Sequence, residues 1–437
     1  MKIYIDTLGC AKNEYDSQVL AASLVDGGCT ITYDPEDADI MIVNTCGFIE
    51  DAKKESIERI FELAAEKNDS KKLIVTGCLS ERYREELKAE MPEVDMFFGV
   101  NEYEELSDII SAGSNNASNE RNRIVIDDLK YRKRNFDDGT YYGYLKIAEG
   151  CNNACSFCAI PLIRGPFRSK KIEDCVHEAR DMAEAGIKEL ILIAQDTSQY
   201  GRDLYGKPKL PELLRELCKI DGIEWIRLMY VYDNGITDEL IKVIADEPKI
   251  CKYIDMPIQH TSDNVLRLMR RRSTGDSIKE VITRLRKEIP DVHIRTTILV
   301  GSPGETESDI DELLDFIDTY DVDRLGAFAF SDEEGTLSFT MDGKVPEEVR
   351  EARRDRVMEH QLAVSEKLNE RKIGKVFEVI TDECIDDGLY EGRTRYDAPE
   401  IDCAVTFRSE RAHKSGDIVR VKITDAYEYD LEGIEFE

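Results

Sequence analysis

The chain has 437 residues, of which 59 are Lys or Arg and 91 are Asp or Glu, giving a net charge of −32. At roughly 100 to 200 residues per domain, this length predicts about two to four domains. A surface this acidic repels phosphate backbones and favours a basic partner, although selection for solubility alone also produces such a charge.

The first residues, MKIYIDTLGC, lack a basic region followed by an apolar run, and nowhere do about 18 apolar residues run together. We therefore expect no secretory signal and no membrane span. The sequence also contains 12 cysteines. In a chain that is not exported, cysteines are expected as reduced thiols or metal ligands, which predicts a cytoplasmic protein without a disulfide framework.

Residues 1–115 alternate apolar runs typical of strands with amphipathic runs typical of helices. The predicted strands are KIYID, DIMIVN and KLIVTG, and the predicted helices are EYDSQVLAASLVD, EDAKKESIERIFELAAE and SERYREELKAE. This order predicts an α/β domain with a mostly parallel sheet. The polar run of small residues at 111–123 is typical of a linker or a mobile loop.

The alternation resumes on a longer scale over residues 137–368. Six apolar runs separated by amphipathic ones are predicted strands, at 141–148, 189–196, 225–231, 253–259, 293–301 and 324–331. They predict an open, barrel-like α/β sheet whose chemistry lies at the carboxyl ends of its strands. Residues 371–437 carry short strand-like runs separated by turn residues, which predict a small β-barrel.

Three cysteines, Cys151, Cys155 and Cys158, form a C-x3-C-x2-C run directly after the first of these six strands. Structural zinc sites favour paired C-x2-C units that supply four ligands, and a fourth ligand is missing here. Three thiolates suit a 4Fe-4S cluster in which one iron stays open for a ligand that is not protein. The alternatives are a zinc knuckle or three unrelated thiols.

A second set of three cysteines stands at the carboxyl ends of three separate predicted strands, namely Cys10, Cys46 and Cys78. In a parallel sheet these ends lie along one edge, where the loops converge on a ligand crevice. The neighbouring Gly9, Gly47 and Gly77 permit close backbone approach. Taken alone, the pattern also fits small buried hydrophobic residues. The other six cysteines are interpreted as core or incidental thiols: Cys29, Cys175, Cys218, Cys251, Cys384 and Cys403.

The six cysteines lie in longer motifs that resemble the radical S-adenosylmethionine (SAM) methylthiotransferase family, which inserts a methylthio group. The matching segments, in the family's order, are LGCAKNEYDSQ, VNTCGFIEDAKKESI, TGCLSERY, EGCNNACSFCAIPLIRGPFRS, ELILIAQDTSQYG, DMPIQHTSDNVLRLMRR, LVGSPGETESD and AFSDEEGT. The resemblance covers almost the whole chain. It implies a methylthiotransferase N-terminal domain at 1–115, a radical SAM partial (β/α)6 barrel at 137–368 and a TRAM β-barrel at 371–437.

The resemblance also implies two 4Fe-4S clusters with different tasks. One cluster generates a 5′-deoxyadenosyl radical from SAM, and its ligands are Cys151, Cys155 and Cys158. The other carries the sulfur, and its ligands are Cys10, Cys46 and Cys78. SAM is both methyl donor and radical source, and a low-potential electron donor such as a flavodoxin is implied.

Three residues are predicted to bind SAM, with the Phe157 ring against the cluster and its backbone toward the adenine. Phe157 lies between two ligands, and Gln195 and Arg295 fall on the second and fifth barrel strands or at their ends, where members of the superfamily contact SAM. No catalytic side chain is predicted, because the cofactor radical abstracts the hydrogen while the protein positions the substrate and excludes water.

The family divides between enzymes that modify a tRNA adenosine and one that modifies the β-carbon of an aspartate in protein S twelve of the small ribosomal subunit. The DAPE tetrapeptide at 397–400 resembles the ribosomal branch. Residues 373–437 hold 8 Lys or Arg and 17 Asp or Glu, a net charge of −9. An acidic barrel suits a basic ribosomal protein better than it suits nucleic-acid phosphates. The sequence therefore predicts the ribosomal substrate.

Two alternatives stay open. In the first, Arg393, Arg395 and Arg408 form a local basic patch and the substrate is tRNA. In the second, the protein has no catalytic activity and is an iron-sulfur electron carrier or scaffold. Two residues depart from the family pattern, since Cys403 stands where glycine is more usual and Ser302 where an aromatic residue is common. Neither is a predicted cluster ligand, so we expect altered local packing and unchanged chemistry.

Overall fold

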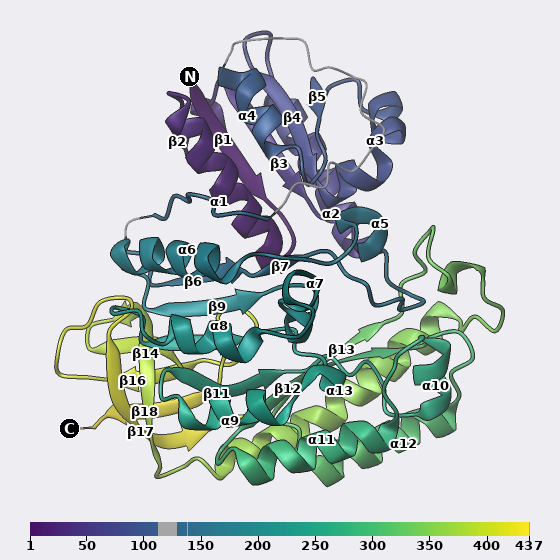
Figure 1. The fold of residues 1–437 in the computed structure, drawn as a ribbon, viewed down its shortest axis with the longest axis vertical. Helices are drawn as coiled ribbons and strands as arrows, with labels where there is room; N and C mark the ends of the chain where they lie inside the picture. The colour runs from purple at the N-terminus through teal and green to yellow at the C-terminus, as the bar shows by residue number, and fades with distance from the viewer. Residues whose placement is uncertain (112–128, 138, 437) are drawn as a thin grey trace.

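The computed structural model describes residues 1–111, 129–137 and 139–436, which form three folded units (Figure 1). Residues 112–123 of the predicted linker lie outside the described residues. The first unit lies at the top of Figure 1, the six-stranded sheet below it, and the C-terminal strands beside that sheet. None of the helices in the described ranges is both long and apolar enough to cross a membrane.

The N-terminal unit is a five-stranded parallel sheet in the order β2-β1-β3-β4-β5, with helices on both faces. Its strands are β1 Lys2–Thr7, β2 Thr30–Thr32, β3 Ile40–Thr45, β4 Lys72–Gly77 and β5 Met96–Phe97, and its helices are α1 Ala11–Asp26, α2 Glu50–Glu66, α3 Cys78–Glu90 and α4 Tyr103–Ser111. Every residue of β3 is buried, because α1 and α4 cover one face and α2 and α3 the other. The parallel sheet was predicted, but the short edge strands β2 and β5 were missed.

The central unit is an open sheet of six parallel strands in the order β13-β12-β11-β10-β9-β6. The strands are β6 Tyr142–Lys146, β9 Glu189–Ile193, β10 Trp225–Leu228, β11 Ile250–Asp255, β12 His293–Val300 and β13 Arg324–Ala329. All six predicted strands are confirmed. Beside them, β7 Ala148–Glu149 and β8 Arg168–Ser169 form a small antiparallel pair.

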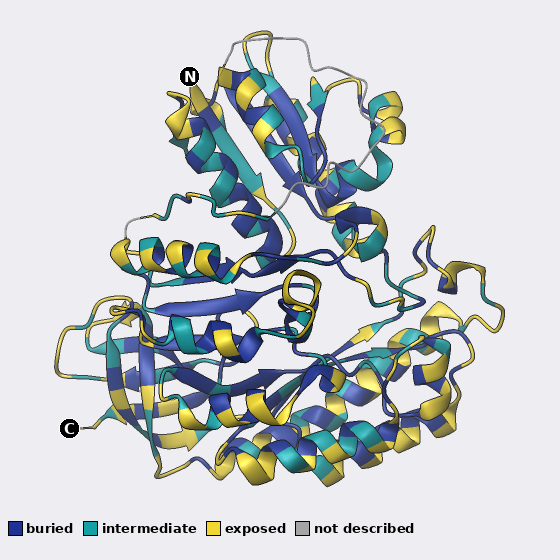
Figure 2. Cartoon of the chain, in the orientation of Figure 1, coloured by how far each residue is buried: buried dark blue, intermediate teal, exposed yellow. Residues whose placement is uncertain are grey.

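Helices pack on the outer face of this sheet and enclose the largest hydrophobic core of the molecule. They are α6 Ile172–Glu184, α8 Leu210–Leu217, α9 Asp238–Asp246, α10 Asp263–Leu268, α11 Gly275–Glu288, α12 Glu307–Tyr320 and α13 Glu347–Glu370. The short helix α7 Arg202–Tyr205 lies beside β8, and α5 Ile160–Arg164 packs against α3 of the N-terminal unit. The strands are mostly buried, whereas α11 and α12 carry exposed residues on their outer sides (Figure 2).

The C-terminal unit is a closed barrel in the order β14-β15-β16-β18-β17, as predicted. Its strands are β14 Val376–Asp386, β15 Leu389–Thr394, β16 Val405–Arg408, β17 Ile418–Ala426 and β18 Leu431–Glu435. Closure leaves no open sheet edge, which matters for a small unit with short strands.

Buried ion pairs attach this barrel to the central sheet. Asp397, the first residue of the DAPE segment, accepts from Arg324 Nη2 on β13 at 2.9 Å. Arg393 Nη1 lies 2.7 Å from Glu189 Oε2 at the start of β9. Because both pairs are buried and cross between the units, they fix how the barrel sits on the sheet.

Replacing Asp397 by Ala is expected to destabilise the protein by about 3 to 5 kcal/mol, because Arg324 is left buried without its carboxylate. Urea unfolding of the metal-free protein measures this. The matched control is Asp387→Ala at an exposed turn, for which a change within about 0.5 kcal/mol is expected. Equal stability of the two variants would contradict this role for Asp397.

Candidate active site

Three cysteine-bearing loops meet at the carboxyl edge of the N-terminal sheet: Cys10 lies between β1 and α1, Cys46 follows β3, and Cys78 begins α3. A Cβ atom on Gly9, whose φ is +94°, would lie 2.7 Å from Cys46 Cβ. A Cβ atom on Gly47 would lie 2.6 Å from Leu79 Cα. The first loop therefore touches the second, and the second touches the third, as the strand-end positions predicted.

Asn13, in the first turn of α1, ties these loops together. Its Nδ2 donates to the carbonyl oxygens of Leu8, at 2.7 Å, and Thr45, at 3.0 Å. Its Oδ1 lies 3.7 Å from Cys78 Sγ. Asn13 is fully buried, and sequence analysis quoted it within a motif without giving it a role. The side chain thus holds the three strand ends at one place.

The second group of cysteines lies on the loop between β7 and α5. The amide of Cys151 donates to the carbonyl oxygen of Gly165 at 3.1 Å, which fixes the start of the loop. The amide of Asn153 donates to Cys151 Sγ at 3.4 Å, and Arg271 Nη1 lies 3.8 Å from Cys155 Sγ. Donors of this kind stabilise negative charge on cysteine sulfur.

Each group supplies three free thiols, a number that suits a 4Fe-4S cluster in which one iron stays open. Across the described ranges, no three Cys, His, Asp or Glu side chains converge closely enough to hold one metal ion. In a 4Fe-4S cluster each thiolate binds a different iron, so the sulfurs need not meet at one point. Burial raises the pKa of Cys46 to about 12, of Cys151 to about 11 and of Cys158 to about 12. Each of these thiols therefore carries its proton near neutral pH in the metal-free protein, and the proton is released when iron binds.

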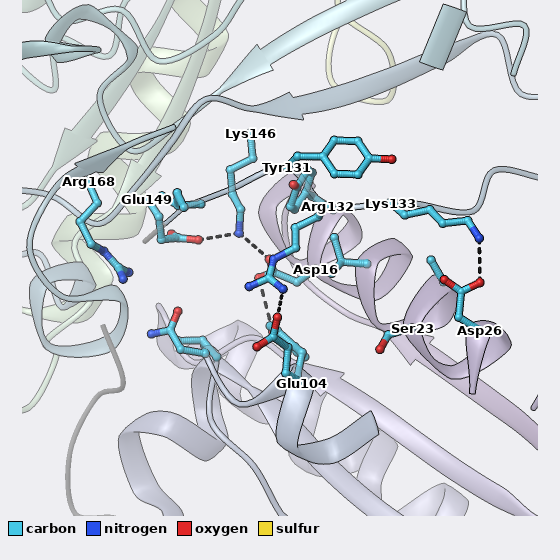
Figure 3. Close-up of a pocket in the computed structure, with 17 residues that line it drawn as sticks. Asp16, Ser23, Asp26, Glu104, Tyr131, Arg132, Lys133, Lys146, Glu149 and Arg168 are labelled. Atoms are coloured by element: carbon cyan, nitrogen blue, oxygen red, sulfur yellow. Dashed lines mark hydrogen bonds and ion pairs between the residues drawn. The ribbon is translucent and has the colours of Figure 1, made fainter. Parts of the chain in front are cut away.

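A buried set of four charged side chains joins the two groups. Lys146 Nζ lies 2.5 Å from Asp16 Oδ1 and 2.6 Å from Glu149 Oε2. Arg164 Nη1 lies 2.6 Å from Asp16 Oδ2 and 3.3 Å from Glu149 Oε2. Figure 3 shows Lys146 between the two carboxylates. Asp16 belongs to the N-terminal unit and the other three to the central unit, so this set spans the boundary.

Arg164 extends this charged set to the cysteines of the N-terminal unit. Its Nη2 donates to Asn13 Oδ1 at 2.7 Å and to Cys78 Sγ at 3.3 Å. At the other end of the charged set, only Gly150 separates Glu149 from Cys151. Burial disfavours the charged form of Glu149, but Lys146 and Arg164 outweigh it and lower the carboxyl pKa. Sequence analysis assigned no role to any of these four charged residues.

Two of the predicted SAM contacts lie at the cysteine loop. Gln195, just past β9, donates from Nε2 to Glu149 Oε1 at 2.7 Å, and its own Oε1 is buried without a hydrogen-bond partner among the described residues. Phe157 lies half-buried between Cys155 and Cys158. The Gln195 amide is thus held at the segment that leads into Cys151, with a free acceptor.

Arg295 on β12 has a different setting. Its Nη1 lies 2.8 Å from Asp255 Oδ1, and its Nε lies 3.3 Å from Asp402 Oδ1 in the C-terminal barrel. Asp402 also accepts from the Tyr253 hydroxyl at 2.6 Å. Arg295 is therefore paired with two carboxylates and connects the inner face of the sheet to the DAPE-bearing segment.

A cavity of about 330 Å³ borders the charged set, between α1, α4, the segment 129–133 and the first barrel strand (Figure 3). Asp16, Lys146 and Glu149 contribute to its lining. None of the six candidate cysteines is among the described residues that line it. This cavity is therefore separate from the cysteine sites.

Comparisons with known proteins find matches in all three folded units. Residues 2–99 match the uncharacterized protein family UPF0004, residues 145–317 the radical SAM superfamily and residues 373–434 the TRAM domain. The chain is 48% identical to the ribosomal protein uS12 methylthiotransferase RimO of Clostridioides difficile, over 99% of this chain and 98% of the relative. The protein of the same name from Acetivibrio thermocellus is 46% identical over 99% of this chain and 98% of its own length.

Solved structures with a similar fold include two radical SAM proteins. The radical SAM methyltransferase TsrM from Kitasatospora setae has a TM-score of 0.56 at 14% identity, covering 75% of this chain and 71% of that chain. The cobalamin-dependent radical SAM enzyme OxsB has a TM-score of 0.51 at 11% identity, covering 82% of this chain and 56% of that chain. Likeness at such low identity concerns the fold, and the predicted fold class is confirmed.

Replacing Arg164 by Gln is expected to lower the free energy of unfolding of the metal-free protein by about 3 to 5 kcal/mol, because Asp16 and Glu149 then share a single buried cation. Urea unfolding checks this. Arg180→Gln, on the exposed side of α6, is the matched control, and a change within about 0.5 kcal/mol is expected. If Arg164→Gln unfolds like this control, the charged set does not hold the two units together.

Proposed function

The chain belongs to the family of ribosomal protein uS12 methylthiotransferases, and we propose that it places a methylthio group on the β-carbon of an aspartate in uS12, protein S twelve of the small ribosomal subunit. The observation that carries this proposal is 48% identity to such an enzyme over 99% of the chain. The similarity therefore includes all three folded units.

The two groups of cysteines divide the work. When bound, a reduced 4Fe-4S cluster supplies the electron that cleaves SAM, which gives the radical needed to remove a hydrogen from an unactivated carbon. We assign this cluster to Cys151, Cys155 and Cys158. We assign the sulfur-carrying cluster to Cys10, Cys46 and Cys78. Each group supplies three ligands, which leaves one iron of each cluster open to a ligand that is not protein.

The proposed SAM contacts are Phe157, Gln195 and Arg295. Gln195 is supported by its bond to Glu149, two residues before Cys151, and by its buried acceptor that has no partner among the described residues. Phe157 is supported by its position between two ligands. Arg295 is paired with Asp255 and Asp402, so any bond it makes to SAM uses donors that these carboxylates leave free.

The charge and packing of the C-terminal barrel support a basic protein as the substrate. Its net charge is −9 over residues 373–437. Arg393, one member of the basic patch that the tRNA alternative requires, is buried and paired with Glu189 and Asp382. Arg395 Nη1 lies 3.3 Å from Glu378 Oε2. Two of the three arginines are thus committed within the protein, which disfavours phosphate binding at this patch.

Other partners follow from the chemistry. Cleavage of SAM consumes an electron of low potential, for which we propose a flavodoxin or a similar reductase. A substrate in the ribosome and thiols kept reduced support a cytoplasmic protein that acts away from membranes.

Replacing Cys151, Cys155 and Cys158 together by Ala is expected to lower the iron content of the anaerobically reconstituted protein from about eight to about four atoms and to abolish SAM cleavage. The variant in which Cys10, Cys46 and Cys78 are all replaced by Ala is also expected to contain about four iron atoms, but it should still release 5′-deoxyadenosine under strong reduction. Iron analysis and chromatography measure both. Cys384→Ala, an exposed thiol, is the control and should behave like the unaltered protein. Full iron content in either triple variant would contradict the assignment.

Deleting the gene from its host is expected to remove the methylthio group from uS12, which mass spectrometry of purified ribosomes detects. The intact chain should restore the modified mass, and the variant with Cys151, Cys155 and Cys158 replaced should not. An unchanged uS12 mass together with loss of a methylthio nucleoside from digested tRNA would favour the tRNA alternative. Iron binding without SAM cleavage would indicate an electron carrier.

A further inference from the structure

One loop of the central sheet, which follows β10, reaches both groups of cysteines. The ring of Tyr232 lies 4.3 Å from the guanidinium carbon of Arg271, whose Nη1 is 3.8 Å from Cys155 Sγ. The ring of Tyr230 lies under the side chain of Lys12, two residues after Cys10. This loop therefore contacts a residue beside each group of cysteines, Arg271 at Cys155 and Lys12 close to Cys10 in the chain.

Lys12 is an unusual cation. It is only 8% exposed, and its Nζ lies 3.2 Å from the centroid of the Tyr230 ring. In the part of the chain that the structure describes, Lys12 makes no ion pair with a carboxylate. By contrast, the buried Lys146 and Lys170 each pair with carboxylates. Burying an ammonium without a carboxylate is costly, and a cation–π contact offsets only part of that cost.

The nearby carboxylate is already engaged. Asp255 Oδ2 accepts from the amide of Tyr230 at 2.9 Å, and its Oδ1 accepts from Arg295 at 2.8 Å. Tyr230 has a φ of +59°, a strained conformation for a tyrosine, and this amide bond helps to hold it. This loop conformation places the Tyr230 ring beneath Lys12, while Asp255 Oδ1 accepts from Arg295. Among the described residues, Lys12 is left with the Tyr230 ring and without a carboxylate partner.

We propose that the ammonium of Lys12 binds the side-chain carboxylate of the aspartate that is modified. This assignment rests on the proposed function, which requires an aspartate side chain between the radical source and the sulfur. An aspartate side chain held between the two groups of cysteines loses its hydration and needs a cation, and Lys12 has none of the carboxylate partners that would compete with it.

The position of the charge also explains how the reacting carbon is aimed. The β-carbon of aspartate is bonded directly to the carboxylate carbon, so fixing the carboxylate fixes the β-carbon within one bond length. A hydrogen can then be removed from one side and sulfur delivered from the other only if the carbon cannot turn away. Lys12 is in this sense a positioning and specificity residue that selects an acidic side chain.

The test measures the affinity of the anaerobically reconstituted enzyme for purified uS12 that carries either the target aspartate or alanine in its place. The unaltered enzyme is expected to bind the aspartate form roughly 10- to 100-fold more tightly, as a charge-assisted bond implies. Lys12→Met should reduce this ratio to about one, since Met can lie on the Tyr230 ring but carries no charge. Lys12→Arg should keep a clear preference for aspartate. Lys242→Met, at an exposed position on α9, is the control and should keep the full ratio.

An unchanged ratio in Lys12→Met, or loss of the ratio in Lys12→Arg as well, would overturn the assignment. An unchanged ratio is also what a residue that only offsets the charge of a cluster would give. Methylthiolation of the same uS12 by the unaltered enzyme is measured in parallel. No modification of uS12 would overturn the proposed function and this assignment with it, whereas modification with an unchanged ratio in Lys12→Met would overturn the assignment alone.

Discussion

The buried charged set of Asp16, Lys146, Glu149 and Arg164 is the interaction on which the site depends. Buried ion pairs contribute little net stability compared with apolar packing, so what this set supplies is position. Two cations and two anions balance one another out of water, and they do so only when the N-terminal unit meets the central sheet in one orientation. That orientation brings Arg164 within 3.3 Å of Cys78 Sγ and places Glu149 next to the loop of Cys151.

This constraint explains why two separate sheets are needed for one reaction. Each parallel sheet gathers its functional loops at the carboxyl ends of its strands, and each edge here carries one group of three cysteines. Replacing an inert C–H bond by a C–S bond requires a radical source and a sulfur source within reach of one carbon. The charged set that joins the two units brings one edge of each sheet to the same boundary.

The C-terminal barrel acts on the same space from a third direction. Asp402, just after the DAPE segment, pairs with Arg295 on the inner face of the central sheet and accepts from Tyr253. Asp397 and Arg393 anchor the same region through Arg324 and Glu189. The segment that resembles the ribosomal branch is therefore a structural part of the inner face, with the side chains of Asp397 and Asp402 buried in ion pairs.

Much of the fold could be predicted from the sequence because it depends on local pattern. The six central strands, the parallel N-terminal sheet and the small barrel follow from apolar periodicity and turn residues. The meeting of Cys10, Cys46 and Cys78 could also be predicted, because the ends of parallel strands share an edge. Edge strand β5 has only two residues, which is too short for a periodic signal.

The parts of the site that could not be predicted depend on contacts between residues far apart in the chain. Arg164 and Asp16 are 148 positions apart, so no spacing rule connects them. Lys12 and Asn13 are neighbours in one motif. The Asn13 side chain hydrogen-bonds to the loops around it, whereas the Lys12 ammonium lies over an aromatic ring of another unit. Arg295 was expected at SAM on account of its strand position, and its pairing with Asp402 depends on how the C-terminal barrel docks.

The proposed reaction requires two four-iron clusters within reach of one substrate carbon. Anomalous diffraction at the iron edge from crystals of the anaerobically reconstituted enzyme tests this requirement directly. We expect two compact iron peaks, one at Cys10, Cys46 and Cys78 and one at Cys151, Cys155 and Cys158, with Lys12 between them. A single iron peak, or a second peak away from the N-terminal cysteines, would contradict it.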